Sequence, residues 1–212
     1  MITDHRYEYY DKDNNHIATK FRQTQDKKFY SEGNMSGAVL FGQNKFNQGG
    51  KYITVCEGEL DAMSAYELLG SKWPVVSIKN GAASALKNCQ QALDYLNKFD
   101  QIVLCFDNDK QGKEAEQKVA KLFEPNKCKI MSLDLKDANE YLKTGQREKF
   151  VNTFWNARTY TPVGIVNLAD LGASLYDEKV NETCLYPWSK MNEKTYGMRT
   201  GELVTFTSGA GM

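Results

Sequence analysis

The sequence predicts an α/β fold with a mainly parallel sheet and flanking helices, preceded by a small α+β N-terminal subdomain. From residue 51 onward, apolar runs typical of buried strands alternate with segments of helical period. We expect the strands near 51–56, 74–78, 101–106 and 127–133. This alternation favours right-handed β–α–β crossovers, and therefore parallel strands. Before residue 51 the pattern differs, because Ile17–Arg22 alternates as a half-buried strand or hairpin does and Asp11–Asn15 is typical of a turn.

Helices are expected between and after these strands. They should lie near 59–69, 84–98, 111–123 and 137–143, with a further helix that ends at Trp155. The helix at 84–98 has Leu86, Cys89, Leu93 and Leu96 at helical spacing, and the one at 111–123 has Ala115, Val119 and Leu122. Each set forms a single apolar face, so we assign both faces to the core.

In the last part of the chain, the alternation of strand and helix patterns stops. Arg158–Gly164 contains Pro162 and indicates a break. An amphipathic helix is expected at 167–179, with Leu168, Leu171 and Leu175 on one face, and a strand at 202–207. We therefore divide the chain into 1–50, 51–157, a linker with a helix at 158–180, and 181–212.

Composition excludes several classes of site. Lys plus Arg and Asp plus Glu each total 27, so any affinity for nucleic acid must be local. The five cysteines lack C-x-x-C spacing, which favours reduced thiols over zinc ligands or disulfides. His5 and His16 are the only histidines, so catalysis would rest on carboxylates. With no long uncharged apolar stretch and no signal-peptide pattern, we expect a cytoplasmic protein without membrane contact.

Acidic side chains follow two of the expected strands. Asp107–Gly112 comes after the apolar run Ile102–Phe106, and Glu57–Asp61 comes after Tyr52–Cys56. Open α/β sheets bind ligands outside the carboxyl ends of their strands, and carboxylates there suit Mg²⁺, which shares its shell with phosphate oxygens. The sequence therefore predicts a metal site for phosphoryl chemistry.

Simpler interpretations of these acids stay open. Asp and Asn favour strand-to-helix turns and cap the following helix, and Glu57 could be a solvated acid that complements a helix dipole. A calcium loop starting at Asp107 is excluded, because Gln111 and Lys118 occupy positions where such a loop needs ligands.

Two further segments could complete the site. Asp137 and Asn139 follow the strand at 127–133, although Asp137 with Glu140 also fits a helix-capping box. The loop Asn80–Gly81 would allow close approach by a nucleotide, although a plain turn explains it nearly as well. At the end of the sequence, Ser208, Gly209 and Gly211 have the texture of a phosphate loop (a partial Walker A motif) without the Gly-Lys-Ser/Thr that completes it.

The motifs Val55–Ala62, Phe106–Gly112 and Lys136–Glu140 resemble, in order and spacing, the toprim domain (a Rossmann-like fold) shared by primases, topoisomerases and some nucleases. More closely, the whole chain resembles the central part of the bifunctional phage primase-helicases of the T-seven type, relatives of the mitochondrial helicase Twinkle. Phe41–Gly42, Asn80–Gly81, Trp155–Ala157 and Gly201–Met212 also fall in that family's order. By this resemblance 1–50 is part of the N-terminal subdomain of the primase core, 51–157 the toprim domain and 181–212 the start of a helicase domain.

The resemblance also implies roles for individual residues. Glu57 would be the catalytic acid/base or metal-water partner, Asp107 and Asp109 the principal ligands of Mg²⁺ or Mn²⁺, and Asp137 an auxiliary ligand supported by Asn139. Basic residues of the N-terminal subdomain contact triphosphate and template in this family. Candidates for that role are Lys20 and Arg22 and, more weakly, Lys27 and Lys28, against the alternative of a solvated strand face.

The function implied is a DNA primase core that makes short RNA primers on single-stranded DNA from ribonucleoside triphosphates. The parent protein would be a helicase/ATPase that forms hexameric rings through the linker and helicase parts and works with a replicative DNA polymerase. Alternatives are a toprim metal-dependent nuclease, a non-catalytic assembly or DNA-binding module and, least of all, a topoisomerase. We expect a fragment without a zinc site or ATP hydrolysis, because a Cys-rich module and the lysine of the phosphate loop are both missing. Lys79 also departs from the small residue common in relatives.

Overall fold

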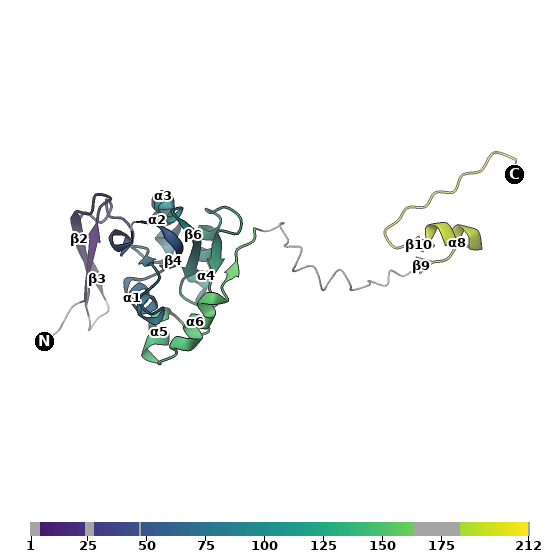
Figure 1. Cartoon of the computed structure of the whole chain (residues 1–212). Helices are drawn as coiled ribbons and strands as arrows, with labels where there is room; N and C mark the ends of the chain where they lie inside the picture. The colour runs from purple at the N-terminus through teal and green to yellow at the C-terminus, as the bar shows by residue number, and fades with distance from the viewer. Residues whose placement is uncertain (1–4, 24–27, 47, 163–182, 212) are drawn as a thin grey trace. The chain divides into compact units, whose positions relative to one another are not determined.

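The computed structural model describes residues 5–23, 28–46, 48–162 and 183–211 (Figure 1). Contacts divide the chain into two compact units, residues 1–165 and 166–212. The finer division at residues 50, 157 and 180 stays a prediction. The helix expected at 167–179 lies outside the described residues.

The first unit is built on a five-stranded sheet of order β5-β4-β6-β7-β8. Four parallel strands lie where the apolar runs predict them: β4 (Gly50–Cys56), β5 (Val75–Ser77), β6 (Phe99–Cys105) and β7 (Cys128–Ile130). The short edge strand β8 (Arg158–Thr159) runs antiparallel to β7 and was not predicted. The predicted α/β fold with a mainly parallel sheet is therefore confirmed.

Four helices lie near their predicted positions: α1 (Glu59–Leu68), α4 (Lys110–Ala120), α5 (Ala138–Lys143) and α6 (Arg147–Trp155). The single helix expected at 84–98 is wrong, because the segment breaks at Ala92 into α2 (Ala85–Gln91) and α3 (Leu93–Leu96), after the 3-10 turn η2 (Ala82–Ser84). Both pieces still bury their apolar residues, among them Cys89 and Leu96. Apolar spacing reports which side is buried, and it does not report whether the backbone is continuous.

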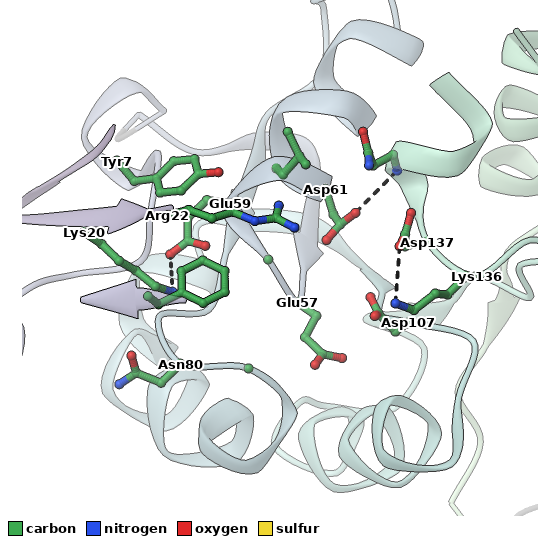
Figure 2. Close-up of a pocket in the computed structure, with 15 residues that line it drawn as sticks. Tyr7, Lys20, Arg22, Glu57, Glu59, Asp61, Asn80, Asp107, Lys136 and Asp137 are labelled. Carbon is green, nitrogen blue, oxygen red and sulfur yellow. Dashed lines mark hydrogen bonds and ion pairs between the residues drawn. The ribbon is translucent and has the colours of Figure 1, made fainter. Parts of the chain in front are cut away.

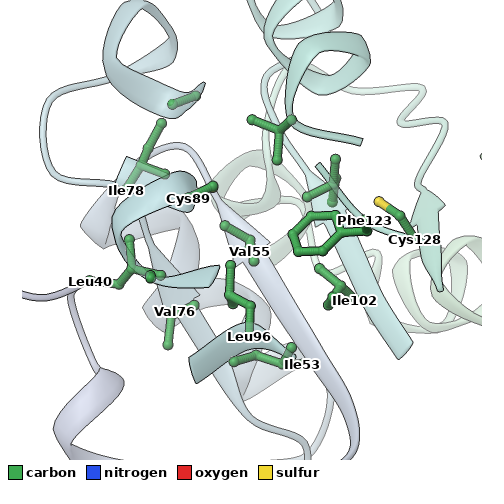
Figure 3. Packing of buried hydrophobic residues seen from close by; sticks show 14 of the residues in the cluster. Leu40, Ile53, Val55, Val76, Ile78, Cys89, Leu96, Ile102, Phe123 and Cys128 are labelled. Carbon is green, nitrogen blue, oxygen red and sulfur yellow. The ribbon is translucent and has the colours of Figure 1, made fainter. Parts of the chain in front are cut away.

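Both faces of the central sheet are covered. On one face, Ile53, Val55 and Ile102 pack with residues of α2, α3 and α4 (Figure 3). On the other face, residues such as Cys56 and Val103 pack with α1, α5 and α6. Strands buried on both faces consist of continuous apolar runs, which explains why the sequence identified them.

A small antiparallel sheet precedes this core. Its order is β1 (His5–Tyr10), β2 (His16–Arg22) and β3 (Phe29–Gly33). The expected turn at 11–15 is confirmed, because Asp11 Oδ1 accepts hydrogen bonds from the backbone N–H groups of Asp13 and Asn15, both at 2.9 Å. After β3, the chain passes through the 3-10 turn η1 (Gln43–Lys45) into β4.

The second unit, in its described part, contains β9 (Thr183–Cys184), α8 (Ser189–Thr195) and β10 (Met198–Arg199). The strand predicted at 202–207 is wrong: these residues form no strand, and Leu203 is 94% exposed. A strand needs a hydrogen-bonded neighbour and a face to bury, and the described part of this unit provides neither for the segment. None of the helices in the described residues has the length and apolar character needed to cross a membrane.

Candidate functional site

The strand register brings the predicted acidic turns to one edge of the sheet. Cys56 pairs with Ser77 of β5 and with Cys105 of β6, so three parallel strands end at the same level. A cavity of about 510 Å³ lies at that edge, lined by residues that follow β4, β5, β6 and β7 and by residues of the small sheet. Figure 2 shows side chains from these separate segments facing one another across it.

Five carboxylates line this pocket. Glu59 is ion-paired with Lys20, and the other four are Glu57, Asp61, Asp107 and Asp137. Three of them were predicted from the sequence. Glu57 Oε1 accepts a hydrogen bond from the backbone N–H of Ala82 at 3.0 Å, while its Oε2 is buried without a hydrogen-bond partner. A buried oxygen left without a partner is unfavourable unless something binds it, so this atom is placed as a ligand atom would be.

Asp61 is a site residue that the sequence reasoning missed. It lies in the first turn of α1 and accepts a hydrogen bond from the backbone N–H of Asn139 at 3.4 Å. Burial, followed by repulsion from Asp137 and Asp107, raises its pKa to about 7. Its position in the first turn of the helix that follows β4 was a usable signal, because ligands bind outside the carboxyl ends of such strands.

The pKa of the Asp107 carboxyl is raised for similar reasons. Burial, then the charges of Glu57 and Asp137, raise its pKa to about 6. The mutual repulsion of the four carboxylates would be relieved by a bound cation.

The donor set fits a hard divalent ion such as Mg²⁺ or Mn²⁺, because it offers only carboxylate oxygens and includes the unpartnered Oε2 of Glu57. Over the described residues, no group of three or more His, Cys, Asp or Glu side chains is already arranged around one point. Mg²⁺ keeps several waters and takes one or two carboxylates together with substrate phosphates, so it does not need such a cage.

Two predicted acids cap helices. Asp109 Oδ1 accepts a hydrogen bond from Gly112 N–H at 2.8 Å, and Asp137 Oδ1 accepts one from Glu140 N–H at 2.8 Å. Asp137 caps α5 and also lines the pocket, whereas Asp109 caps α4 and is not among the lining residues. For Asp109 the geometry matches the capping interpretation, and its metal-binding role stays a prediction.

The opposite wall of the pocket is basic. Lys20 and Arg22 both line it, whereas Lys28 does not and Lys27 lies outside the described residues; the nucleotide-binding role of Lys20 and Arg22 stays a prediction. Lys20 Nζ lies 2.7 Å from Oε1 of the buried Glu59, and donates to the carbonyl oxygen of Lys79 at 2.8 Å.

Glu59 accepts a second hydrogen bond, from the hydroxyl of Tyr9. The charge of Lys20 is therefore already balanced. Arg22, by contrast, makes no ion pair with a carboxylate in the described part of the chain, and it is close enough to Tyr7 to lower the pKa of that hydroxyl against the larger raising effect of burial.

The loop after β5 reaches the pocket through Asn80 and Gly81. Gly81 has φ of 69°, and a Cβ there would lie 3.6 Å from Glu57 Oε1. The preceding Lys79 turns its buried ammonium away, toward the carbonyl oxygens of Ala38 and Met35. The unexpected lysine therefore does not obstruct the loop's approach to the pocket.

Gly112 fixes how closely α4 can approach the Asp107 turn. A Cβ at Gly112 would lie 2.2 Å from the carbonyl oxygen of Asp107, which is closer than any side chain permits. Glycine is therefore required at this position of the Asp-x-Asp-x-x-Gly turn. The predicted phosphate-loop residues Ser208, Gly209 and Gly211 belong to the second unit and are exposed.

Comparison with known proteins identifies relatives of this chain and of its fold. The family model described as Toprim-like matches residues 54–142. A DNA helicase/primase of Enterobacteria phage T3 is 34% identical over 209 residues, which cover 97% of this chain and 37% of that protein. The chain therefore spans little more than a third of this relative's length.

Two solved structures are also similar. The first is the complex of the bacteriophage T7 lagging-strand DNA polymerase with the primase domains of two subunits, bound to an RNA/DNA hybrid and dTTP. It matches with a TM-score of 0.69 and 36% identity, over 75% of this chain and 80% of the matched chain. The second is the primase fragment of the bacteriophage T7 primase-helicase, with a TM-score of 0.66 and 35% identity, over 73% of this chain and 63% of that one.

Proposed function

The chain belongs to the family of bifunctional phage primase-helicases that carry a Toprim domain, and we propose that it is the catalytic core of a DNA primase. It would join ribonucleoside triphosphates into short RNA primers on a single-stranded DNA template, as a metal-dependent nucleotidyltransferase. The observation that carries this proposal is the convergence of four carboxylates on a pocket whose opposite wall presents Arg22.

The carboxylates of the acidic wall would bind the metal, and one of them would accept a proton. Glu57, Asp61, Asp107 and Asp137 are the residues that would bind Mg²⁺ or Mn²⁺, with Asp109 a further candidate next to Asp107. A divalent ion bound here supplies charge neutralisation for the triphosphate and activation of a ribonucleotide 3′-hydroxyl. Glu57 Oε2 is an acceptor suited to the proton of that hydroxyl, because it is buried and has no other partner.

The basic wall would bind the substrate. Arg22 can pair with a phosphate, because no carboxylate of the described residues neutralises it. Asn80 and Gly81 would approach the nucleotide from the loop after β5, and Asn139 would orient the acidic turn through its N–H to Asp61. Lys20 would act mainly by holding Glu59 and the carbonyl of Lys79 in place.

The partners we propose follow from the relatives. The T7 primase domains in the solved complex interact with a DNA polymerase and bind an RNA/DNA hybrid. By the same logic, this chain would act with a replicative polymerase in the cytoplasm of the phage's host. In its full-length parent, an ATP-driven helicase, it would join hexameric rings through the linker and the part containing Ser208, Gly209 and Gly211.

A primer-synthesis assay tests the proposal. The chain is incubated with end-labelled single-stranded DNA, labelled ribonucleoside triphosphates and Mg²⁺ or Mn²⁺, and the products are resolved on one denaturing gel. We expect template-dependent RNA ladders that Asp107→Asn lowers by at least about 100-fold, because the loss of a ligand oxygen removes several kcal/mol of transition-state stabilisation.

The matched control is Asp134→Asn, which removes an exposed carboxylate paired with Lys149 outside the pocket. The control should keep the ladders, and Asp107→Asn should fold as the wild type does, because losing one carboxylate also relieves repulsion. Full synthesis by Asp107→Asn would contradict the metal-ligand assignment. Shortened DNA without ladders would show a nuclease instead, and an unchanged gel with Mn²⁺ would indicate a non-catalytic module.

A further inference from the structure

The basic wall of the pocket carries an aromatic ring that the carboxylate chemistry does not use. Phe29, at the start of β3, lines the pocket and is nevertheless 51% exposed. Lys20 Nζ lies 4.8 Å and Arg22 Cζ 5.6 Å from the centre of its ring. Both cations lie over the ring and cover part of it, and the half that stays exposed gains free energy when a flat ligand covers it.

The strand register determines which face of the small sheet carries the Phe29 side chain. Phe29 pairs with Arg22 across β2 and β3, and the next pair, Tyr30 with Phe21, points to the opposite face of the sheet. Phe21 and Tyr30 stack on each other, with centroids 4.7 Å apart and planes 9° apart. Each ring of the outer pair therefore covers one face of the other, and Tyr30 stays 43% exposed on the side away from the pocket, whereas Phe29 lines the pocket.

The charges beside the ring also differ. Lys20 is balanced by Glu59 at 2.7 Å. Arg22 has no carboxylate partner among the described residues. In Figure 2, Arg22 reaches from the small sheet toward the acidic side chains of the pocket. An open aromatic ring beside an unneutralised guanidinium fits a ligand that has both a flat ring and a phosphate, which describes a nucleotide.

We propose that Phe29 is the stacking platform for the base of the incoming nucleotide, whose phosphates extend past Arg22 toward the four carboxylates. The proposal rests on the primase function, since that function supplies the nucleotide. Base–aromatic stacking tolerates every base, because each has a π-face, so Phe29 would add affinity without choosing the base that the template selects.

Comparing two ligands, one with a base and one without, distinguishes base stacking from the binding of phosphate charge. Binding of ATP and of inorganic tripolyphosphate to the full chain is measured calorimetrically with Mg²⁺ present. We expect Phe29→Ala to weaken ATP binding by about 5- to 150-fold, the range for loss of one stacked base. Tripolyphosphate, which has no base, should bind within about 2-fold of wild type. Phe29→Trp should preserve ATP binding, and Arg22→Ala should weaken both ligands.

The control is Tyr30→Ala, which removes the neighbouring aromatic ring on the opposite face and should leave ATP binding unchanged. The inference is overturned if Phe29→Ala binds ATP as the wild type does, if both ligands weaken equally, or if the wild type binds no ATP. It is also overturned if Phe29→Ala loses only single-stranded DNA binding, since the ring would then stack a template base. Nucleotide binding that needs Phe29, without any primer synthesis, would refute the primase function and keep the subsite.

Discussion

At the scale of single residues, the least expected group is the buried carboxyl of Glu116 on α4. It is 6% exposed, and its Oε1 accepts a hydrogen bond from the backbone N–H of Phe106 at 3.3 Å. Burial raises its pKa to about 8, against smaller lowering effects of the Phe106 N–H and of Lys113. Glu116 therefore holds a proton at neutral pH next to the turn that carries Asp107.

This proton predicts a pH dependence of stability. The folded-state pKa of Glu116 lies above its ordinary value, so its contribution is fully present below about pH 4.5 and is lost as the pH rises toward 8. Glu116→Gln should remove that loss and be more stable than wild type at pH 8 by roughly 2–4 kcal/mol, with little difference at pH 4.5. Urea unfolding of both proteins at pH 4.5 and pH 8 measures this difference in the free energy of unfolding.

A matched control is Glu114→Gln, an exposed carboxyl on the same helix, which should follow the wild type at both pH values. Asp61 and Asp107 have pKa values raised to about 7 and 6, so their ionisation also lowers the free energy of unfolding as the pH rises. Part of the decrease in stability with pH should therefore persist in Glu116→Gln. Equal slopes for Glu116→Gln and wild type would show that Glu116 is ionised in the folded state.

At the scale of elements, a buried lysine joins the segment after β3 to the central sheet. Lys79 follows β5 and is 5% exposed, and its ammonium donates to the carbonyl oxygens of Ala38 and Met35. Its backbone N–H donates to Asn88 Oδ1 of α2 at 2.8 Å, and its carbonyl accepts from Lys20. One residue thus ties three elements together behind the pocket.

Lys79→Met should lower the free energy of unfolding by about 1–3 kcal/mol, because it leaves buried carbonyl oxygens without donors, although it also removes a buried charge. Denaturant unfolding measures the loss, with Lys118→Met on the exposed side of α4 as the control. A Lys79→Met chain as stable as the control would mean that water replaces the ammonium at these carbonyls.

At the scale of the whole molecule, the hydrophobic clusters formed by the described residues all belong to the first unit. The two clusters on either face of the central sheet, and the third around Tyr7, Tyr9, Ala18 and Ala38, lie within residues 1–165. The candidate site lies there too, because every residue that lines the pocket precedes residue 140.

A chain that ends at Ile165 should therefore unfold cooperatively, with a free energy of unfolding within about 0.5 kcal/mol of the first transition of the whole chain. It should also bind ATP with the same affinity. Denaturant unfolding followed by aromatic fluorescence, together with ATP titration, provides the test. Loss of the cooperative transition would show that residues after 165 contribute to the core of the first unit.

The sequence by itself determined the parallel sheet and the place of most of the acids. Strands buried on both faces have to be continuous apolar runs, and acids that follow parallel strands have to meet at one edge, so Glu57, Asp107 and Asp137 could be assigned to one site. The hairpin before the sheet was predicted for the same kind of local reason, from its alternation and its turn.

Only the tertiary structure decided which way individual side chains point and what they contact. It placed Asp61 in the pocket, directed Asp109 to a helix cap, balanced Lys20 with Glu59 and left Phe29 open. The tertiary structure also showed that the helix predicted at 84–98 is interrupted at Ala92 and that residues 202–207 form no strand. These outcomes depend on pairs as far apart as Lys20 and Glu59, separated by 39 residues, and local sequence patterns do not encode such pairs.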